Sequence, residues 1–583
     1  MTLSAVAVVA AMFLQSDDFA DAQIGLKTIY VDRQDAYAAD DNPGTASLPL
    51  LTLSRAIALA SEANANTIPV RIIVGPGVYR ESLRIASDEE TTPAPISIEG
   101  AEDGVLVSGA DVWDGWTHVG DGVYSHPWPY DWGLAAMPQE WPERVRSYLE
   151  ANPIIRRNEM VFVDGAPLRQ VLSRSELENA DGRFLVSEET DEIFLHLAPT
   201  TDLTESIVEV STRPSLMFIA SRENITLRNI QFVRAANAAG AAGAVAITNS
   251  RNVEVIDCVF DWNNGSGLSL HPGEEITVRG IQANHNGVGG FTGFGVRKLR
   301  VYDSEASFNG WRASSGWDIS DHSSVLDMNF IDFAAGQKFF RLRDASFVRF
   351  RAVNNLTGGL WLDYDNEGVS LEGLTLNGNL THGLFVEASQ GPISLEVSQV
   401  CRNETGILVG NASEVTVLEN VIAMNALAQI FVAGEGERVV GVHDTGQAVS
   451  VGTRDWRIED NRIDVIDGSV AVGTHLNQDD WQWFISSSTS EANRYSSPMT
   501  DEIFQLPGGR TITLGQWRSE TGQDFESSFV GNNPACPMPA GRVGPDRSRR
   551  WSLLIALLLA TFTIVTALVI WRFRPRGASG DER

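Results

Sequence analysis

Two carboxylates in neighbouring copies of one sequence pattern are the residues best placed to do chemistry. The pattern runs from Asn355 to Asp363 (NLTGGLWLD) and again from Asn379 to Glu387 (NLTHGLFVE), so each of its parts recurs after 24 residues. Two acids held side by side can share a proton, and glycosidases use such a pair as acid and nucleophile or base. Asp363 and Glu387 are therefore the candidate catalytic pair.

The alternation of a β-strand decides where these side chains point. Leu360 and Leu362 fall on one face of the strand, and Trp361 and Asp363 on the other. Burying carboxylates costs more free energy than burying aliphatic side chains gains, so the acids are predicted to face outward. If the two copies stack as strands about 4.8 Å apart, the carboxylates lie roughly 5 Å apart, a separation that favours retaining hydrolysis.

Aromatic residues beside the pair predict a binding platform for a sugar ring. Trp361 and Phe385 occupy the same place in the two copies, and Tyr364 follows the first acid directly. Indole and phenyl faces pack against the apolar face of a sugar, although they also fill cores. We assign these three residues to the substrate-binding set.

Lys338 lies one copy earlier on the same predicted face. Gly336 and Gly359 are 23 residues apart, which aligns Lys338 with Trp361. The ammonium group could neutralise Asp363, form an ordinary surface ion pair, or as an amine act as the base of a β-elimination. A loop of residues 312–324 precedes this copy and is predicted to overhang the same face, so the substrate-binding set also includes Trp311, Asp318 and His322.

A longer periodicity explains the two copies. Asparagines occur at 264, 286, 309, 355, 379, 403 and 425, separated by 22 to 24 residues except for one interval of 46. We interpret that interval as two repeats with Asp332 at the midpoint. Short β-branched segments between asparagine and glycine turns predict an all-β, single-stranded parallel β-helix, in which the asparagines stack and play a structural role.

The N-terminal region carries a family resemblance. Residues 28–31 (TIYV), 40–45 (DDNPGT), 53–60 (LSRAIALA) and 71–81 (RIIVGPGVYRE) follow one another in the order strand, loop, helix, strand. This order resembles the opening of pectate-lyase-like right-handed parallel β-helix proteins, a superfamily rich in polysaccharide lyases and glycoside hydrolases. The resemblance implies an N-terminal cap, a polysaccharide or glycan substrate and, because many lyases of this fold need calcium, a possible calcium site at Asp363, Asp365 and Glu387.

Composition narrows the partners. The net charge of −31 and the pI near 4.6 argue against nucleic acid and anionic membrane surfaces as partners. The three cysteines, Cys258, Cys401 and Cys536, form no recognisable disulfide framework or zinc motif. Cys258 and Cys401 are predicted to be small buried hydrophobic residues.

Both termini predict export and anchoring. Residues 4–14 are apolar and are followed by Ala20-Asp21-Ala22, the form of a signal peptide. Trp551–Trp571 contains no charge and has a Trp at each end, which predicts one transmembrane helix. Arginines flank it on both sides and do not set its orientation, but a cleaved signal peptide places the β-helix body on the extracytoplasmic side of the cell membrane. The predicted segments are a signal peptide (1–22), cap and first coils (23–150), a small β module (151–210), β-helix coils (211–530), a linker (531–550), the membrane helix (551–571) and a basic tail (572–583).

Three functions fit these features. The leading hypothesis is an exported, membrane-anchored glycoside hydrolase that uses Asp363 and Glu387. The alternatives are a polysaccharide lyase with Lys338 as base and calcium as cofactor, and a non-catalytic glycan-binding surface protein. The sugar, the linkage and the oligomeric state are left open by the sequence.

Overall fold

The computed structural model describes residues 25–86, 94–102, 104–139, 141–314, 336–434, 436–442, 445–531 and Cys536. All of them belong to one compact unit that ends at Cys536. The predicted signal peptide and membrane helix lie outside the described residues, as do Asp318 and His322. Among the helices that are described, none is long and apolar enough to cross a membrane.

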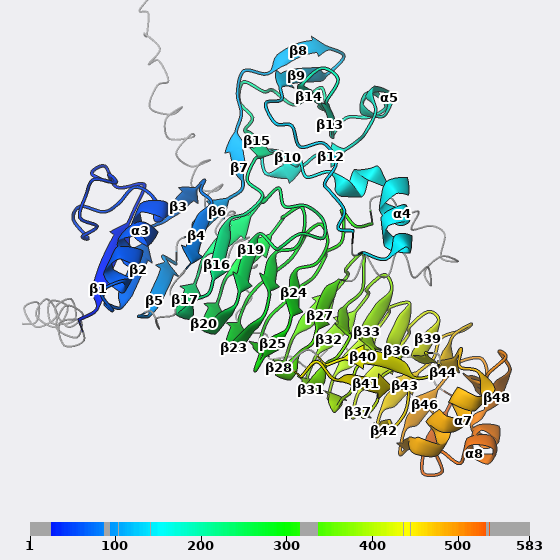
Figure 1. Cartoon of the computed structure of the whole chain (residues 1–583). Helices are drawn as coiled ribbons and strands as arrows, with labels where there is room; N and C mark the ends of the chain where they lie inside the picture. The colour runs from blue at the N-terminus through cyan, green and yellow to red at the C-terminus, as the bar shows by residue number, and fades with distance from the viewer. Residues whose placement is uncertain are drawn as a thin grey trace, which may run out of the picture. The chain divides into compact units, whose positions relative to one another are not determined.

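The chain winds through successive coils and adds a strand to each of three long sheets (Figure 1). The first sheet is parallel throughout. Its strands are β1 (Lys27–Val31), β2 (Val70–Val74), β5 (Ile96–Gly100), β17 (Glu223–Arg228), β20 (Ser250–Ile256), β23 (Gly273–Arg279), β25 (Val296–Arg297), β26 (Arg300–Tyr302), β28 (Arg343–Val348), β31 (Glu367–Glu372), β34 (Ile393–Glu396), β37 (Val415–Leu418), β42 (Arg457–Glu459) and β45 (Thr489–Glu491).

The second sheet carries the candidate site. It is parallel except for its last pair of strands. Its strands are β4 (Leu83–Ala86), β16 (Met217–Ala220), β19 (Val245–Thr248), β22 (Leu268–Leu270), β24 (Phe291–Phe294), β27 (Gln337–Phe340), β30 (Leu360–Asp363), β33 (His382–Glu387), β36 (Thr405–Gly410), β39 (Ala428–Ala433), β44 (Val470–Thr474), β47 (Glu502–Gln505) and β48 (Thr511–Thr513).

The third sheet consists of two runs of short strands joined by isolated bridges through Gln282 and Glu305. Three faces of parallel strands, added coil by coil, make a parallel β-helix. The third-sheet strands are β3 (Gly77–Tyr79), β6 (Val105–Ser108), β18 (Gln231–Val233), β21 (Val259–Asp261), β29 (Arg351–Val353), β32 (Thr375–Asn377), β35 (Gln399–Cys401), β38 (Val421–Ala423), β43 (Arg462–Asp464), β46 (Arg494–Ser496) and β49 (Ser528–Val530).

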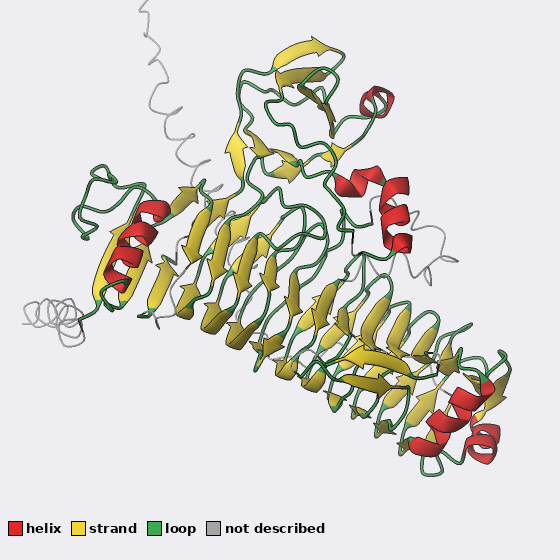
Figure 2. Cartoon of the chain, in the orientation of Figure 1, coloured by secondary structure: helices red, strands yellow, loops and turns green. Residues whose placement is uncertain are grey.

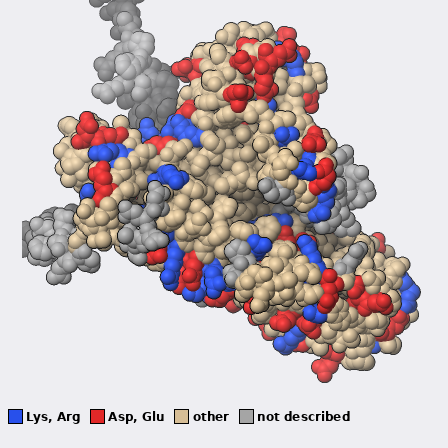
Figure 3. Space-filling view, viewed as in Figure 1, with Lys and Arg blue, Asp and Glu red and all other residues tan. Residues whose placement is uncertain are grey.

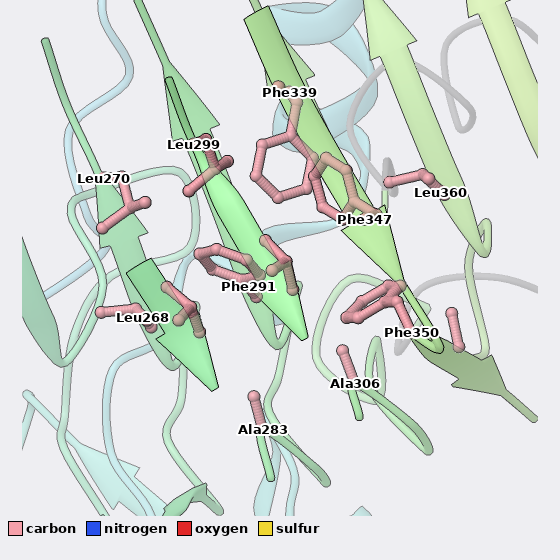
Figure 4. Close-up of a cluster of buried hydrophobic side chains, with 14 of the residues drawn as sticks. Leu268, Leu270, Ala283, Phe291, Leu299, Ala306, Phe339, Phe347, Phe350 and Leu360 are labelled. Carbon is pink, nitrogen blue, oxygen red and sulfur yellow. The ribbon is translucent and has the colours of Figure 1, made fainter. Parts of the chain in front are cut away.

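The lumen is filled by one continuous hydrophobic cluster that runs from Ile29 to Trp517. Figure 4 shows part of it, where Phe291, Phe339 and Phe347 point inward from neighbouring coils. Each fully buried side chain of this size contributes about 1.5–3 kcal/mol, so stability grows with every coil added.

The predicted asparagine ladder is present, with two corrections. It begins at Asn263, whose amide donates to Asn286 Oδ1 at 2.9 Å, and not at Asn264. Asn309 donates directly to Asn355 Oδ1 at 3.1 Å, so the interval of 46 residues is one coil with an excursion, and the skipped repeat predicted at Asp332 is wrong. The sequence interval alone could not distinguish two coils from one coil with an insertion.

The turn before each ladder asparagine has the same backbone. Trp262, His285, Phe308, Asn354 and Arg402 all have φ between 54° and 58°. Side chains that rarely adopt left-handed φ do so here, at a cost of roughly 1–2 kcal/mol each. The stacking of coils therefore imposes this conformation against local preference.

A small β module interrupts the coils (Figure 2). Asp164 and Gly165 form a hairpin turn in it, since Val163 pairs with Ala166 across them. The module also takes two strands from residues 117–127, which the sequence assigned to the first coils, because β14 pairs with β9. Its elements are β7 (Ala110–Val112), β8 (Thr117–Gly120), β9 (Val123–Pro127), β10 (Val161–Val163), β11 (Ala166–Pro167), β12 (Arg169–Gln170), α5 (Arg174–Glu178), β13 (Arg183–Ser187), β14 (Glu192–His196) and β15 (Val208–Ser211). In the same stretch of sequence, α4 (Glu143–Ala151) and η1 (Pro153–Arg156) instead pack with Val288 and Ala313 of the coils.

Other segments lie outside the repeating coils. Helix α3 (Leu53–Asn64) contributes to the lumen cluster beside the first strands, and α7 (Gln478–Ser487) and α8 (Leu514–Thr521) contribute at the other end. An antiparallel hairpin of β40 (Arg438–Gly441) and β41 (Ala448–Val451) leaves the coils after β39.

One cysteine prediction is wrong. Cys401 in β35 is not a free buried residue but forms a disulfide with Cys536, which lies 135 residues further along the chain. Cys258 is buried and free, as predicted. Spacing alone did not reveal the bridge, because the coils bring β35 and the end of the described chain together.

Candidate functional site

The candidate site lies on the outer face of the second sheet, where β27, β30 and β33 are neighbours. Lys338 pairs in register with Trp361, and Trp361 pairs with Phe385, both as predicted. Leu362 and Val386 pair as well and belong to the lumen cluster. The outward side chains of the three coils therefore form one line across the sheet.

Asp363 is held by an ion pair. Lys338 Nζ lies 2.8 Å from Asp363 Oδ2, and the two side chains are only 15% and 12% exposed. The ammonium also lies 3.5 Å from the centre of the Trp361 ring and 4.7 Å from that of Phe340. Such contacts are stronger in a desolvated site, so Lys338 and Trp361 fix the position of the Asp363 carboxyl group on the outer face.

Glu387 has a different environment. Its Oε1 accepts a hydrogen bond of 2.6 Å from Arg438 Nη1. Burial, and then the nearby negative charge of Asp363, raise the pKa of Glu387 to about 7, while Arg438 and Lys338 act in the opposite direction. At neutral pH this carboxyl group is therefore partly protonated, whereas Asp363 has a cation in contact.

The predicted aromatic platform is buried. Trp361 and Phe385 stack with ring centres 4.7 Å apart, and they are 0% and 4% exposed. Both point away from the lumen and form a second hydrophobic cluster with Leu408 and Phe431. Lys338 from the preceding coil and Phe385 from the following coil flank the indole. Trp361 thus supports the Lys338 ammonium, and in this structure it offers no open face to a sugar ring.

His382 is a further member of the site, which the sequence analysis did not single out. It begins β33, is 1% exposed and lies edge-on to Trp361 at 5.9 Å between ring centres. Burial and the charge of Lys338 lower its pKa to about 3, so the imidazole is neutral at physiological pH. Its Nδ1 is 3.2 Å from Thr381 Oγ1.

The space for this imidazole comes from a glycine. A Cβ atom on Gly358 would lie 2.2 Å from His382 Nε2. The signal was present in the sequence, since the two copies differ at this point as Thr-Gly-Gly and Thr-His-Gly. A small residue in one coil opposite a large one in the next indicates packing between coils.

Arg438 is the second residue that the sequence analysis missed. It comes from the β40–β41 hairpin, 51 residues after Glu387. The available signal was a lengthened repeat: Asn420 bonds to Asn461, an interval of 41 residues where most coils take 22 to 24. An interval of that length marks an insertion, but it does not say which coil the insertion contacts.

The remaining predicted residues have other contacts. The Tyr364 hydroxyl accepts a hydrogen bond of 2.9 Å from the Gly441 N–H, so this residue contacts the hairpin. The Trp311 indole N–H donates to the His285 carbonyl at 2.8 Å. Neither contact is to the carboxylate pair.

The predicted calcium ligands do not converge. Tyr364 and Asp365 both have positive φ, which turns the chain away from the strand, and Asp365 is buried against Arg343 at 2.7 Å. Asp365 therefore does not share the outward face of Asp363 and Glu387. Within the described ranges, no group of three His, Cys, Asp or Glu side chains is arranged to hold a metal ion.

Charge on the outer surface is mixed. On the face shown in Figure 3, acidic and basic side chains are interspersed over the coils, and acidic side chains gather on the β module. The site follows the same rule on a smaller scale, since each of its two carboxylates contacts one cation.

Fold and site together define a parallel β-helix with two neighbouring carboxyl groups, in different environments, on the outside of one sheet. A family model described as right handed beta helix region matches residues 243–422, which confirms the resemblance and the handedness. No curated protein matches the chain.

Solved structures share this fold at low identity. The complex structure of XylC with xylose is 14% identical, with 87% of this chain and 86% of that chain covered and a TM-score of 0.62. The A-module of the mannuronan C-5 epimerase AlgE4 from Azotobacter vinelandii is 12% identical, with 86% and 100% covered and a TM-score of 0.45. A structure titled glycoside hydrolase is 12% identical, with 88% and 97% covered and a TM-score of 0.41. At 14% identity, the likeness to the XylC structure shows the fold alone.

Proposed function

We propose that this chain is a carbohydrate-active β-helix protein, specifically a glycoside hydrolase with Glu387 as proton donor and Asp363 as the partner carboxylate. The observation that carries the proposal is the contrast between the two acids. Asp363 contacts the Lys338 ammonium at 2.8 Å, whereas burial and the charge of Asp363 raise the pKa of Glu387 to about 7. Pairs of acids whose environments push their pKa values apart divide the roles of acid and base.

The proposed chemistry uses the raised pKa of Glu387 and the position of Asp363 beside it. Glu387 gives its proton to the glycosidic oxygen as the bond from that oxygen to the anomeric carbon breaks. A carboxylate oxygen of Asp363 forms the new bond to the anomeric carbon, as the retaining mechanism predicted from strand spacing requires. Water then displaces Asp363 after giving a proton to Glu387, which restores both groups.

The first substrates to test are xylose-containing oligosaccharides. The XylC structure, which covers most of this chain, contains xylose according to its title. Because Lys338 and Arg438 already contact the protein's own acids, an uncharged sugar suits this site better than a uronate.

The proposal includes export and anchoring. Disulfides persist in oxidising compartments, so the Cys401–Cys536 bridge supports an extracytoplasmic body. The predicted signal peptide and the predicted helix at 551–571 would then place the solenoid outside the cell, attached to the membrane. Helix α3, which packs beside the first strands, would serve as the N-terminal cap.

The test is turnover by conservative variants. Glu387→Gln and Asp363→Asn should each lower kcat by about 10²–10⁴-fold on any oligosaccharide that the wild type cleaves, measured as new reducing ends. Glu372→Gln is the matched control, because Glu372 is an exposed acid on the first sheet. Wild-type turnover by both site variants would reject the pair as catalytic.

A lyase is the second candidate, because Lys338 lies within the site. Its Nζ atom lies 2.8 Å from Asp363 Oδ2 and 3.5 Å from the centre of the Trp361 ring, so the group is already engaged in contacts within the protein. Products that absorb near the enone band, formed by the wild type and lost on Lys338→Met, would favour the lyase. Binding to oligosaccharides without any product would identify a glycan-binding surface protein.

A further inference from the structure

The β40–β41 hairpin reaches back along the solenoid from the coil in which it begins. The chain leaves the coils after β39 and has returned to them by Thr453, whose hydroxyl accepts from the Asn411 N–H at 3.0 Å. Between these points the hairpin extends past the coils of β36 and β33 to that of β30, because Gly441 bonds to Tyr364. Stacked coils are about 4.8 Å apart, so the hairpin spans roughly 15 Å.

One face of the hairpin packs on the coils. Val440 and Val451 are fully or almost fully buried, and they form a small hydrophobic cluster with Ala388. Val439, which points the other way, is 64% exposed. By strand alternation Arg438 shares the packed face of Val440, which directs its side chain to Glu387, the residue before Ala388.

Tyr364 fixes the far end of the hairpin. Its ring lies between two guanidinium groups, with ring-centre distances of 5.3 Å to Arg341 and 5.9 Å to Arg438. Its hydroxyl accepts the Gly441 N–H at 2.9 Å. The same side chain therefore contacts both the arginine that binds Glu387 and the strand that carries this arginine.

We propose that the β40–β41 hairpin is a positioning arm that holds Arg438 against Glu387, with Tyr364 as its anchor. The proposal rests on the proposed function, since it concerns the proton donor of that reaction. Arg438 is a positioning residue and not a catalytic one, because it acts through Glu387.

The charged groups that face Glu387 come from three elements. Lys338 on β27 and Arg438 on β40 stabilise its anion, and Asp363 on β30 opposes it. Burial and Asp363 raise the pKa of Glu387, and Arg438 lowers it. Removing Arg438 should therefore raise this pKa further. A general acid with a higher pKa keeps its proton to higher pH, and the alkaline limb of the pH–rate profile therefore moves upward.

The experiment compares pH–rate profiles of four variants on the best oligosaccharide substrate. Arg438→Met should move the alkaline limb upward by about 1 pH unit, the size expected when an adjacent opposite charge is removed. Tyr364→Phe, which loses only the hydroxyl, should move it in the same direction by less, and Arg438→Lys should restore most of the wild-type profile. Arg457→Met is the matched control, because Arg457 pairs with Glu459 on the first sheet and should leave the profile unchanged.

Two outcomes would overturn the arm. One is an unchanged alkaline limb in Arg438→Met with a wild-type melting temperature, and the other is an equal shift in Arg457→Met. Failure of the proposed function is recognised separately, as full turnover by Glu387→Gln. In that case the arm is tested by carboxyl ¹³C NMR, where Arg438→Met should raise the titration midpoint of Glu387 relative to wild type. An unchanged midpoint would reject the arm.

Discussion

The asparagine ladder and the carboxylate pair both stack one kind of side chain at the spacing of the coils, but they do so with opposite electrostatic results. An asparagine amide both donates and accepts, so each member satisfies the next, as Asn355 and Asn379 do at 2.8 Å. An ionised carboxylate only accepts, so Glu387 gains no hydrogen bond from Asp363; burial and then the charge of Asp363 raise the pKa of Glu387. The ladder extends over many coils because each addition is favourable, whereas the pair stops at two and depends on cations from elsewhere.

The largest expected effect comes from breaking the ladder. Asn379→Ala removes hydrogen bonds to the backbone and amide of Asn355, to the Ala352 carbonyl and to Asn403, and leaves buried polar groups without partners. We expect a loss of about 3–5 kcal/mol in the free energy of unfolding, measured by urea denaturation.

The control for the ladder is an asparagine outside it. Asn66→Ala loses one exposed hydrogen bond to Glu62 and should change stability by less than about 0.5 kcal/mol. Equal losses for Asn66→Ala and Asn379→Ala would contradict the view that stacking within the ladder, and not asparagine as such, stabilises the coils.

A smaller loss of stability is expected from changing Gly358, which lies opposite the His382 side chain and leaves space for it. Gly358→Ala puts a Cβ atom 2.2 Å from a buried imidazole and should cost about 1–3 kcal/mol. Gly358→Ala combined with His382→Ala should cost less than the two single changes together, because the clash is then removed. Gly515→Ala is the control, since its Cβ would meet nothing nearer than 3.8 Å. Additive losses would show that the two residues do not share this space.

The smallest effect concerns the pair itself and depends on pH. The folded protein raises the Glu387 pKa from 4.5 to about 7, so the unfolded chain releases this proton first as pH rises, and the folded state loses stability between those values. Glu387→Gln cannot ionise, and its melting temperature relative to wild type should therefore rise from pH 4.5 to pH 8. At pH 8 we expect the free energy of unfolding of Glu387→Gln to exceed that of the wild type by about 1–2 kcal/mol. This is less than the pKa shift alone would give, because the variant also loses the ion pair between Glu387 and Arg438. A difference that stays constant with pH would contradict the raised pKa.

The direction of the side chains in the repeated strands was predictable from the sequence, because the pattern recurs in successive coils. Alternation in Leu360–Asp363 correctly separated lumen residues from outward ones, and the glycine register correctly aligned Lys338 with Trp361. Repetition is a signal that a single sequence carries. The prediction that Trp361 is exposed was wrong, because strand alternation gives the direction of a side chain but not what packs over it.

The contacts that give Asp363 and Glu387 different environments were not fully predictable, because Arg438 lies in a segment that breaks the repeat. Arg438 reaches Glu387 from an insertion 51 residues away, and Cys536 meets Cys401 across 135 residues. Neither pairing has a local signature in the chain. For the same reason the 46-residue interval was assigned two coils, although Asn309 bonds directly to Asn355.

The disulfide also determines how the solenoid responds to a pull from its C-terminal side. Cys401 lies in β35, and three further strands of the third sheet separate β35 from β49 at the end of the described coils. Tension applied to the chain beyond residue 536 therefore enters the solenoid at β35 and bypasses the last coils. Those coils therefore lie outside the path of the load as long as the disulfide is intact. Under such a pull, the force is therefore first applied to the coil at Cys401, the one that follows Glu387.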